Sequence, residues 1–328
     1  MLKVGVLGAG HLGKIHIKLL KESKAYELCG FFDNNQEHAA AVAEELGVAA
    51  YEDMDALIQA VDVVDIVTPT LAHFECAKKA IAAGKHIFIE KPVTYSLEEG
   101  ESLKELVREA GVKAQIGHVE RFNPAFMAAK DFDLRPMFVE SHRLAQYNPR
   151  GTDVSVVLDL MIHDIDILLH LIPHEVVEVR ASGVPVISDT PDIANARISF
   201  ANGSIANLTA SRASLKKERK MRLFQKNAYI TINFLDKEVN VFKIKDGASQ
   251  DNPLSMVIDA GNGQKKTITY SAPKVPEVNA IKEELERFAR AISTDSKPEV
   301  TLTDGLASLR LAFQVLAEIE RNLAKIQD

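Results

Sequence analysis

A glycine-rich turn near the amino terminus limits the folds open to this chain. Residues 3–7 form a short apolar run, and Gly8-Ala9-Gly10-His11-Leu12-Gly13 follows at the start of a segment with helical periodicity. A strand that passes into a helix through GxGxxG predicts the first turn of a βαβ unit. The glycines there permit a sharp turn, close approach of the backbone to a ligand, and tight packing of the helix against the strand.

The same alternation continues through the first third of the chain. Short β-branched runs at 3–7, 26–32, 63–67, 86–89 and 113–116 alternate with helical patterns at 11–21, 36–46, 73–83 and 97–110. Strands separated by helices predict a parallel sheet with crossover connections. We therefore expect an α/β Rossmann domain with a doubly wound parallel sheet over residues 1–120.

Beyond residue 121 the pattern changes to one apolar helix followed by closely spaced strands. The helix is predicted over 155–172, the strands over 175–182, 192–200, 204–211, 221–225, 229–234 and 239–244, and further helices over 278–292 and 306–326. The short links predict a predominantly antiparallel sheet, with a tight hairpin at 201–203 and a polar loop or frayed hairpin at 245–264.

We therefore expect an α+β domain over 121–328, with its carboxy-terminal helices packing back toward the first domain. Its sheet should be open-faced, with helices on one side. Strands 194–200 and 205–211 carry apolar residues in both registers, which predicts a homodimer or homotetramer formed through the uncovered face.

An acidic residue follows the second predicted strand. Asp33 lies about 20 residues beyond Gly13, where a carboxylate can bind the adenosine ribose hydroxyls of a dinucleotide. Its charge would repel the 2′-phosphate of NADP, and the neighbouring Asn34 and Asn35 supply no arginine for that phosphate. NAD is thus the predicted cofactor. The alternative is a glycine turn without ligand, in which Asp33 only caps the helix that starts near Gln36.

Composition excludes several other classes of protein. A formal net charge of −7 provides no basic field for nucleic acid or an anionic membrane. The two cysteines, Cys29 and Cys76, lack the spacing of a disulfide framework or zinc site. The sequence shows neither a secretory leader nor a membrane-spanning apolar run. We expect a cytoplasmic protein without a metal, nucleic-acid or membrane partner.

Further motifs carry a resemblance to a known family. They are Thr68-Pro69, His73, Gly84-Lys85-His86, Glu90-Lys91-Pro92, Arg121-Phe122-Asn123-Pro124, and Asp159-Leu160-Met161-Ile162-His163. The chain resembles the Gfo/Idh/MocA family of oxidoreductases over nearly its whole length. A GxGxxG turn is common, but EKP at this position followed by a DxxxH helix is quite specific. The resemblance implies NAD-dependent oxidation of a hydroxyl group.

The resemblance also assigns roles to individual residues. It implies that Lys91 hydrogen-bonds the reacting hydroxyl, and that Asp159 and His163 lie on the substrate side of the nicotinamide, with the histidine as proton acceptor. Met161 departs from the glycine found in many members, which affects the shape of the pocket. The implied cofactor contacts are Gly8, Gly10, His11, Leu12, Gly13, Asp33, Thr68, Pro69, His73, Glu90 and Lys91, and the substrate contacts Arg121, Asn123, Arg143 and Arg150.

Elementary chemistry supports the catalytic assignment. Oxidation of a secondary alcohol needs a base that titrates near neutrality, as histidine does. Asp159 and His163 are spaced to share one helical face, and Lys91 ends a parallel strand, at the edge of the sheet where ligands bind. The alternative for Lys91 is a solvated surface lysine, and the alternative for His163 is a histidine buried in the core. A metal at His163 and Asp166 is disfavoured, because no second histidine lies one turn away.

Two strings narrow the substrate class. Residues 117–124 and 148–153 resemble the subgroup of this family that oxidises the 3-hydroxyl of UDP-N-acetylglucosamine. His142, Arg143 and Arg150 would suit a diphosphate, although such arginines can also brace a domain interface. The remaining alternatives are an inositol or free-sugar dehydrogenase, an NAD-dependent glycosidase, and a non-catalytic NAD-binding regulator. Retention of Lys91, Asp159 and His163 speaks against the regulator.

Overall fold

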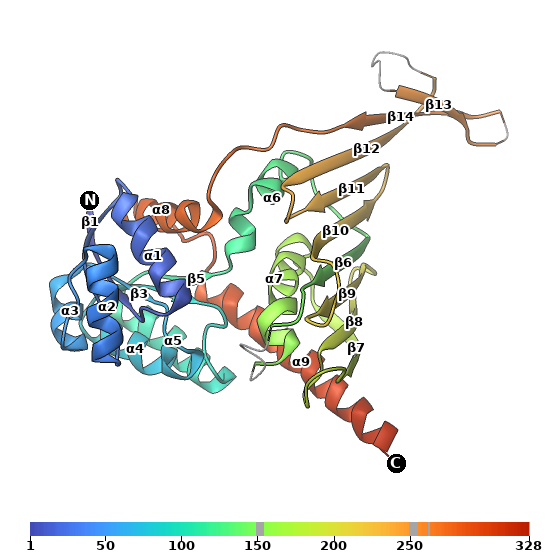
Figure 1. Cartoon of the computed structure of the whole chain (residues 1–328). Helices are drawn as coiled ribbons and strands as arrows, with labels where there is room; N and C mark the ends of the chain where they lie inside the picture. Colours follow the sequence, from blue (N-terminus) through green and yellow to red (C-terminus); the bar gives the residue numbers. More distant parts are fainter. Residues whose placement is uncertain (149–153, 249–254, 262, 328) are drawn as a thin grey trace. The chain divides into compact units, whose positions relative to one another are not determined.

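The computed structural model describes residues 1–148, 154–248, 255–261 and 263–327. The chain divides into two compact units (Figure 1). The first unit comprises Met1–Phe122 and Val278–Arg310, and the second comprises Asn123–Glu277 and Leu311–Asp328.

The described residues of the first unit form a five-stranded parallel sheet in the order β2-β1-β3-β4-β5, which confirms the predicted doubly wound fold. Its strands are β1 (Leu2–Leu7), β2 (Tyr26–Phe32), β3 (Val63–Ile66), β4 (His86–Glu90) and β5 (Ala114–Gly117). Its helices are α1 (His11–Glu22), α2 (Gln36–Leu46), α3 (Met54–Ala60), α4 (Thr70–Ala82) and α5 (Leu97–Ala110), with the short 3₁₀ turn η1 (Val119–Phe122). The strand order reverses between β1 and β3, and ligands bind such sheets at that point.

The first unit is completed by chain that follows the second unit in sequence. Helix α8 (Ala280–Ser293) packs beside α1 on one side of the sheet, and α4 and α5 lie together on the other side (Figure 1). Leu285 and Phe288 of α8 join the core formed by Ile17, Phe31 and Phe88. Helix α9 (Leu302–Gln327) contributes its first residues to this unit and the remainder to the second.

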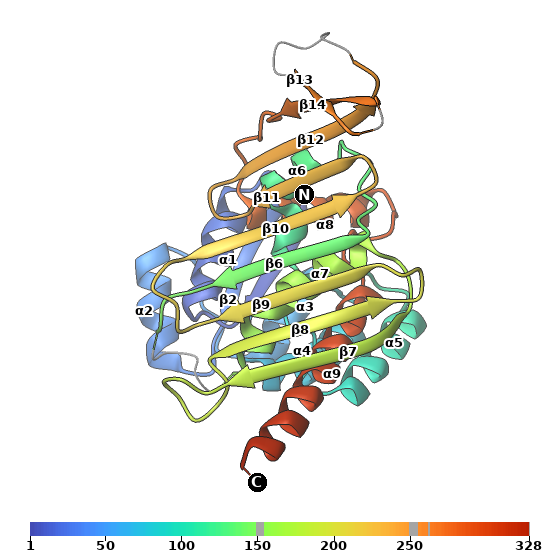
Figure 2. The same ribbon diagram turned by 90° about the vertical axis from the view of Figure 1, so that its right-hand side faces the viewer.

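The second unit is built on a sheet whose described strands follow the order β13-β14-β12-β11-β10-β6-β9-β8-β7. They are β6 (Phe138–Leu144), β7 (Val176–Val184), β8 (Ile193–Phe200), β9 (Ile205–Ser211), β10 (Glu218–Gln225), β11 (Ala228–Asn233), β12 (Glu238–Asp246), β13 (Ser255–Asp259) and β14 (Lys265–Ser271). All neighbouring pairs are antiparallel except β6 with β9. Figure 2 looks onto the open face of this sheet, with α6 (Pro124–Ala129) and α7 (Ile162–Leu171) behind it.

The predicted apolar helix is present but begins with an irregular turn. Residues Val157–Met161 form the π-helical turn η2, in which the N–H of Ile162 donates to the carbonyl of Val157, and α7 continues from there. Met161, Ile165 and Leu168 are fully buried against the sheet. A helix so apolar is stabilised by this burial, at roughly 2 kcal/mol for each large side chain.

One loop of the second unit is organised around a buried carboxylate. Asp192 is fully buried and its Oδ2 accepts hydrogen bonds from the N–H groups of Val186, Ile187 and Ser188 at 2.8, 2.6 and 2.9 Å. Arg212 Nε donates to its Oδ1 at 3.0 Å. Burial alone would raise the pKa of Asp192, but the donors of Ile187 and Ser188 outweigh it and hold that pKa well below its usual range.

Candidate cofactor and substrate sites

The glycine turn leaves open space where a dinucleotide would need it. Gly8 adopts φ +94°, and a Cβ there would lie 2.7 Å from the carbonyl oxygen of Val67. A Cβ on Gly13 would collide with the carbonyl oxygen of Gly8, whereas one on Gly10 would meet nothing within 4 Å. Gly10 is the N-cap of α1 and supplies no capping side chain. The first amides of α1 thus face space suited to a diphosphate.

A cleft of about 620 Å³ opens beside this turn, within the first unit. Of the predicted cofactor residues, it is lined by Gly8, Gly10, His11, Leu12, Asp33, Thr68, Pro69, Glu90 and Lys91. Gly13 instead serves the packing of α1 against the turn, and His73 lies behind the lining, as described below. Sequence reasoning missed Met54, Ala72, Glu75, Cys76 and Lys79, which also line it. The last four recur at helical spacing on one face of α4, and this periodicity was the sequence signal from which they could have been predicted.

Asp33 faces the cleft from the end of β2. Its Oδ2 accepts a hydrogen bond from the N–H of Ala9 at 2.8 Å, and its Oδ1 accepts one from Asn35 at 3.0 Å. The cap of α2 is Asn35, whose side chain accepts from the N–H of His38. The alternative role of Asp33 as that cap is therefore wrong. Its carboxylate is held beside the glycine turn, so the residues present fit NAD: donors for the diphosphate and an acceptor for the ribose.

His73 supports the cleft from behind. It is 1% exposed, its Nδ1 lies 2.9 Å from the carbonyl oxygen of Pro92, and its Nε2 lies 2.9 Å from that of Thr68. Burial lowers the pKa of His73. The imidazole therefore spans the loop after β3 and the loop after β4, and helps to set the distance between Thr68 and the segment that carries Lys91.

In the second unit, Asp159 lies in η2 and His163 at the start of α7. Both side chains are half-buried, while Met161, Ile162 and Asp164 beside them are buried. Residues four apart lie on one face in either helix type, so contact between these two side chains stays a prediction from their spacing. Single π-helical turns recur at functional sites, because the extra residue redirects side chains.

Arg143 has a structural contact next to His163. Its Nε and one terminal nitrogen donate to the two carboxylate oxygens of Asp164 at 2.9 and 3.1 Å, and both residues are almost completely buried. This bidentate pair ties β6 to α7. The sequence showed a cation that suits a diphosphate but did not show the acid that meets it.

Two of the other predicted substrate residues, Arg121 and Asn123, also have partners within their own units. Arg121 in η1 is buried, with its guanidinium 3.4 Å from the carbonyl oxygen of Glu299. Asn123 caps α6 and donates to the carbonyl oxygen of Phe234 at 3.1 Å. Arg150 lies outside the described residues. A substrate contact by any of these side chains stays a prediction.

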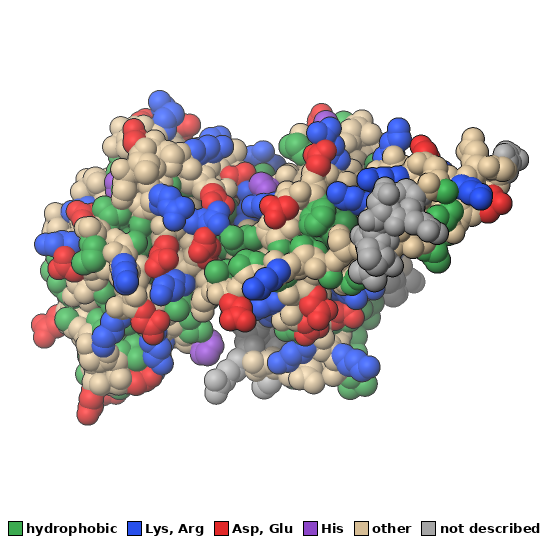
Figure 3. All heavy atoms as spheres, turned by 90° about the horizontal axis from the view of Figure 1, so that it is seen from above, with side chains coloured by type: hydrophobic (Ala, Val, Ile, Leu, Met, Phe, Trp, Pro, Cys, Tyr) green, Lys and Arg blue, Asp and Glu red, His purple; other side chains and the backbone are tan. Residues whose placement is uncertain are grey.

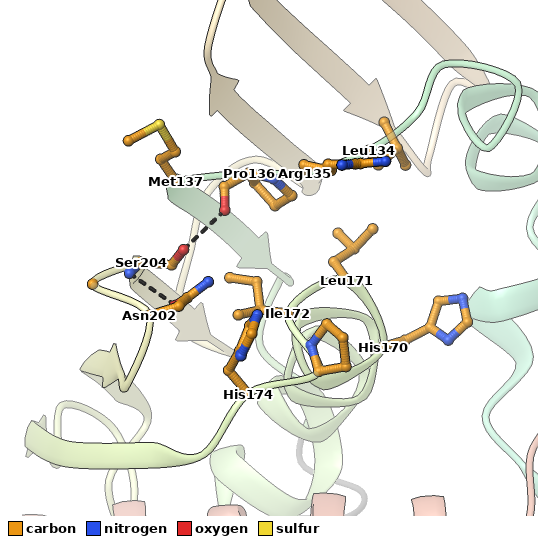
Figure 4. Close-up of a pocket in the computed structure, with 12 residues that line it drawn as sticks. Leu134, Arg135, Pro136, Met137, His170, Leu171, Ile172, His174, Asn202 and Ser204 are labelled. Atoms are coloured by element: carbon orange, nitrogen blue, oxygen red, sulfur yellow. Dashed lines mark hydrogen bonds between the residues drawn. The ribbon is translucent and has the colours of Figure 1, made fainter.

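A second cavity, of about 700 Å³, lies in the second unit between the start of β6, the turn that joins β8 to β9, and the end of α7 (Figure 4). It is lined by Leu134, Arg135, Pro136, Met137, His170, Leu171, Ile172, Pro173, His174, Asn202, Gly203 and Ser204. Two hydrogen bonds join groups of its lining: Ser204 Oγ donates to Pro136 O and the Ser204 N–H donates to Asn202 Oδ1, both at 3.1 Å. None of the predicted site residues lines this cavity.

The described residues show neither a continuous charged patch on the face in Figure 3 nor a helix suited to a membrane. On the face shown in Figure 3, acidic and basic side chains are interspersed, without a continuous patch of one sign. Among the described helices, none is both long and apolar enough to cross a bilayer. The described part of the chain also contains no group of three or more His, Cys, Asp or Glu side chains arranged to hold a metal ion.

Comparisons with known proteins agree with the fold and cleft. A family model described as an oxidoreductase family with an NAD-binding Rossmann fold matches residues 2–118, and the model of the GFO/IDH/MocA C-terminal domain matches residues 105–231. The chain therefore belongs to the Gfo/Idh/MocA family of NAD-binding oxidoreductases, and its first unit contains the NAD-binding Rossmann domain.

Among its relatives, the chain is 36% identical over 328 residues to the UDP-N-acetylglucosamine 3-dehydrogenase of Acidithiobacillus ferrooxidans, covering 99% of each chain. A solved structure of that enzyme matches with a TM-score of 0.88 over 98% of each chain. The NAD-dependent scyllo-inositol 2-dehydrogenase of Bacillus subtilis is 34% identical over 232 residues, covering 65% of this chain and 68% of that protein. A scyllo-inositol dehydrogenase of Lactobacillus casei, 21% identical, shares the fold with a TM-score of 0.78 over 98% of each chain.

Proposed function

We propose that this protein uses NAD to oxidise a secondary hydroxyl of a nucleotide sugar, and that its substrate is UDP-N-acetylglucosamine, oxidised at the 3-hydroxyl. The observation that supports this substrate most directly is the 36% identity, over 99% of both chains, to a dehydrogenase of that name. A partial match to one domain would support only the fold. A match through both domains includes the residues that select a substrate.

The first unit binds the cofactor. The amides at the start of α1 bind the diphosphate, where Gly10 leaves space. Asp33 accepts hydrogen bonds from the adenosine ribose and disfavours NADP by charge repulsion. When bound, NAD supplies the acceptor for the hydride that leaves the substrate carbon.

The chain's own side chains handle the proton and the developing charge. Lys91 donates a hydrogen bond to the reacting oxygen, and its ammonium stabilises the alkoxide as it forms. His163 takes the hydroxyl proton through its imidazole, and Asp159 orients that ring and stabilises its protonated form. The oxidised product is a ketone, and the proton leaves through His163 to solvent.

The direct experiment is incubation of the purified protein with NAD and a panel of substrates. The panel contains UDP-N-acetylglucosamine, UDP-N-acetylgalactosamine, N-acetylglucosamine, glucose, myo-inositol and scyllo-inositol. We expect absorbance of NADH and a product two mass units lighter with the first compound. Turnover of free sugars without turnover of UDP-sugars would contradict the substrate assignment. Release of a sugar from a glycoside without accumulation of NADH would indicate a glycosidase instead.

A second candidate is oxidation of an inositol. It is supported by the 34% identity to the Bacillus subtilis scyllo-inositol 2-dehydrogenase. That match covers 65% of this chain, which is why we rank it below the nucleotide sugar. The inositols in the panel test it directly, because an inositol enzyme would reduce NAD with them and leave the UDP-sugars unchanged.

We propose further that the second unit binds the substrate and a second copy of this chain. A row of aromatic rings crosses the open face of its sheet, from Phe138 through Phe224, Tyr229 and Phe242 to Tyr270, with neighbouring ring centres 4.7–5.8 Å apart. Residues that alternate with them, such as Leu223 and Ile230, are buried on the other face. A homodimer or homotetramer through this face would remove the rings from water.

Light scattering tests this assembly. Replacing Phe224, which is 39% exposed, by glutamate should shift the particle toward the monomer mass. A wild-type protein that runs as a clean monomer would contradict it. We place the protein in the cytoplasm, where reduced thiols such as those of Cys29 and Cys76 persist. Fractionation of cells that express the tagged protein tests that location.

A further inference from the structure

Three ionisable side chains form a row inside the first unit. His16 on α1 is fully buried, Asp65 on β3 is 1% exposed, and Glu90 at the end of β4 is 8% exposed. His16 Nδ1 lies 2.8 Å from Asp65 Oδ2, and its Nε2 lies 3.3 Å from Glu90 Oε1. Neither His16 nor Asp65 lines the cleft. The presence of both in the core therefore needs another explanation.

The imidazole of His16 lies between the two carboxylates, with Nδ1 against Asp65 and Nε2 facing Glu90. Burial by itself lowers the pKa of His16, but the Asp65 carboxylate, with a smaller contribution from Glu90, raises it well above its ordinary value. Burying a histidine between two carboxylates costs desolvation free energy, which their mutual attraction offsets only in part. Apolar residues of the same volume are often at least as stabilising, so stability alone does not explain this row.

Glu90 connects the row to Lys91. Its Oε2 accepts a hydrogen bond from the backbone N–H of Lys91 at 3.2 Å. Gly117 is its register partner on β5, and a Cβ there would lie 2.7 Å from Glu90 Oε1. Glycine at that position therefore leaves the space that the carboxylate occupies. His16, the backbone of Gly117 and the N–H of Lys91 together hold Glu90 on three sides.

The same turn is held from its other end. His73 Nδ1 lies 2.9 Å from the carbonyl oxygen of Pro92, the residue after Lys91. Thus both neighbours of Lys91 in the chain are fixed by a buried histidine, Glu90 by His16 and Pro92 by His73. At the other end of the row, Asp65 Oδ1 is buried and has no hydrogen-bond partner among the described residues. The row thus holds Glu90 between His16 and the turn that carries Lys91.

We infer that His16 and Asp65 are positioning residues for Lys91: they fix the carboxylate of Glu90, and Glu90 fixes the backbone from which Lys91 reaches the reacting hydroxyl. This inference deepens the proposed function and rests on the role of Lys91 in it. A displacement of about 1 Å at a catalytic group can cost a large part of the rate without changing cofactor affinity.

Two substitutions at one position separate positioning from packing. His16→Leu fills the volume but leaves no polar group opposite Glu90, whereas His16→Gln keeps an N–H group on the side where His16 Nε2 lies 3.3 Å from Glu90 Oε1. Val42→Ala, a cavity in the same core on α2, is the matched control for lost stability. For each variant kcat, the NADH dissociation constant, the melting temperature and the rate of acetylation of Lys91 by acetic anhydride are measured, the last by peptide mass spectrometry. The acetylation rate requires no substrate.

We expect His16→Leu to lower kcat at least about 10-fold and to change the acetylation rate of Lys91 about 3-fold or more, with NADH affinity within about 2-fold of the wild type. His16→Gln should keep kcat within about 3-fold of the wild type, and Val42→Ala should lower only the melting temperature. Asp65→Asn should also lower kcat and change the acetylation rate of Lys91, and it replaces His16→Leu if that variant does not fold.

The failures of the two proposals can be told apart. Unchanged kcat and unchanged acetylation of Lys91 in both His16→Leu and Asp65→Asn would overturn the positioning role alone. So would equal losses of kcat in His16→Leu, His16→Gln and Val42→Ala, because that pattern reports stability only. Full activity of Lys91→Ala, in contrast, would overturn the role of Lys91 in the proposed function, whatever the His16 variants do.

Discussion

Replacing Gly10 or Gly13 by alanine adds one methyl group to the same turn, with opposite expected consequences. Gly10 has φ −62° and ψ −165°, an extended conformation that alanine adopts without strain, and its Cβ would meet nothing within 4 Å. At Gly13 the Cβ would collide with the backbone carbonyl of Gly8, which no side-chain rotation can relieve. Gly10→Ala should therefore weaken only the binding of the cofactor, whereas Gly13→Ala should lower the stability of the fold.

The sizes of these effects follow from the geometry. For Gly13→Ala we expect overpacking to lower the free energy of unfolding by about 2 kcal/mol, or the melting temperature by about 4–8 °C for a unit of this size. For Gly10→Ala the loss of stability should stay within about 0.5 kcal/mol. The methyl group would stand where the diphosphate approaches, which should weaken NAD binding at least about 10-fold, or about 1.4 kcal/mol.

The assays are thermal unfolding without ligand and a fluorescence titration with NADH. Each variant serves as the control for the other, because the chemical change is identical. A Gly10→Ala protein that binds NADH as tightly as the wild type would refute the placement of the diphosphate at this turn. A Gly13→Ala protein as stable as the wild type would refute the packing argument.

Four other substitutions test separate parts of the reasoning. Lys91→Ala and His163→Ala should each lower kcat at least about 100-fold while leaving the NADH dissociation constant within about 2-fold, and an active His163→Ala would exclude that residue as the base. Asp33→Asn should weaken NAD and favour NADP, shifting the ratio of their dissociation constants by about 10-fold; an unchanged ratio would contradict the ribose contact. Asp192→Asn should lower the free energy of unfolding at neutral pH. The folded-state pKa of Asp192 is depressed, so its stabilisation is present above about pH 4 and is lost as the pH falls through the folded-state pKa. The difference in free energy of unfolding between the variant and the wild type, measured by urea unfolding, should therefore shrink below about pH 4.

Some elements could not be predicted, for reasons visible in their residues. Strand β6 lies in the middle of the second sheet, yet its buried positions include Ser141 and Arg143 as well as Val139, so it shows no apolar alternation. Helix α3 is only seven residues long, too short to display a clear period. A loop or frayed hairpin was expected over residues 245–264, and β13 there does form a hairpin with β14, but no strand was predicted at β14 itself.

The cofactor site was largely predictable because its parts are local. GxGxxG, the acid after β2 and the loops after β3 and β4 all lie at strand ends, and a doubly wound sheet brings such ends together. The partners of the arginines were not predictable. Arg143 pairs with Asp164, 21 residues further along the chain, and no periodicity in either segment predicts that ion pair.

The amino-acid sequence by itself determined the class of this protein: the order of strands and helices, the glycine turn, and the EKP and DxxxH motifs are all short-range patterns. Only the tertiary structure decided that α8 completes the core of the first unit, that Asp65, His16 and Glu90 form one buried row, and that Gly117 makes room for it. The physical reason is the separation along the chain over which each kind of interaction acts. Periodicity and turn chemistry act over a few residues, whereas charge pairing and packing join residues 49 apart, such as His16 and Asp65, which only the folded chain brings into contact.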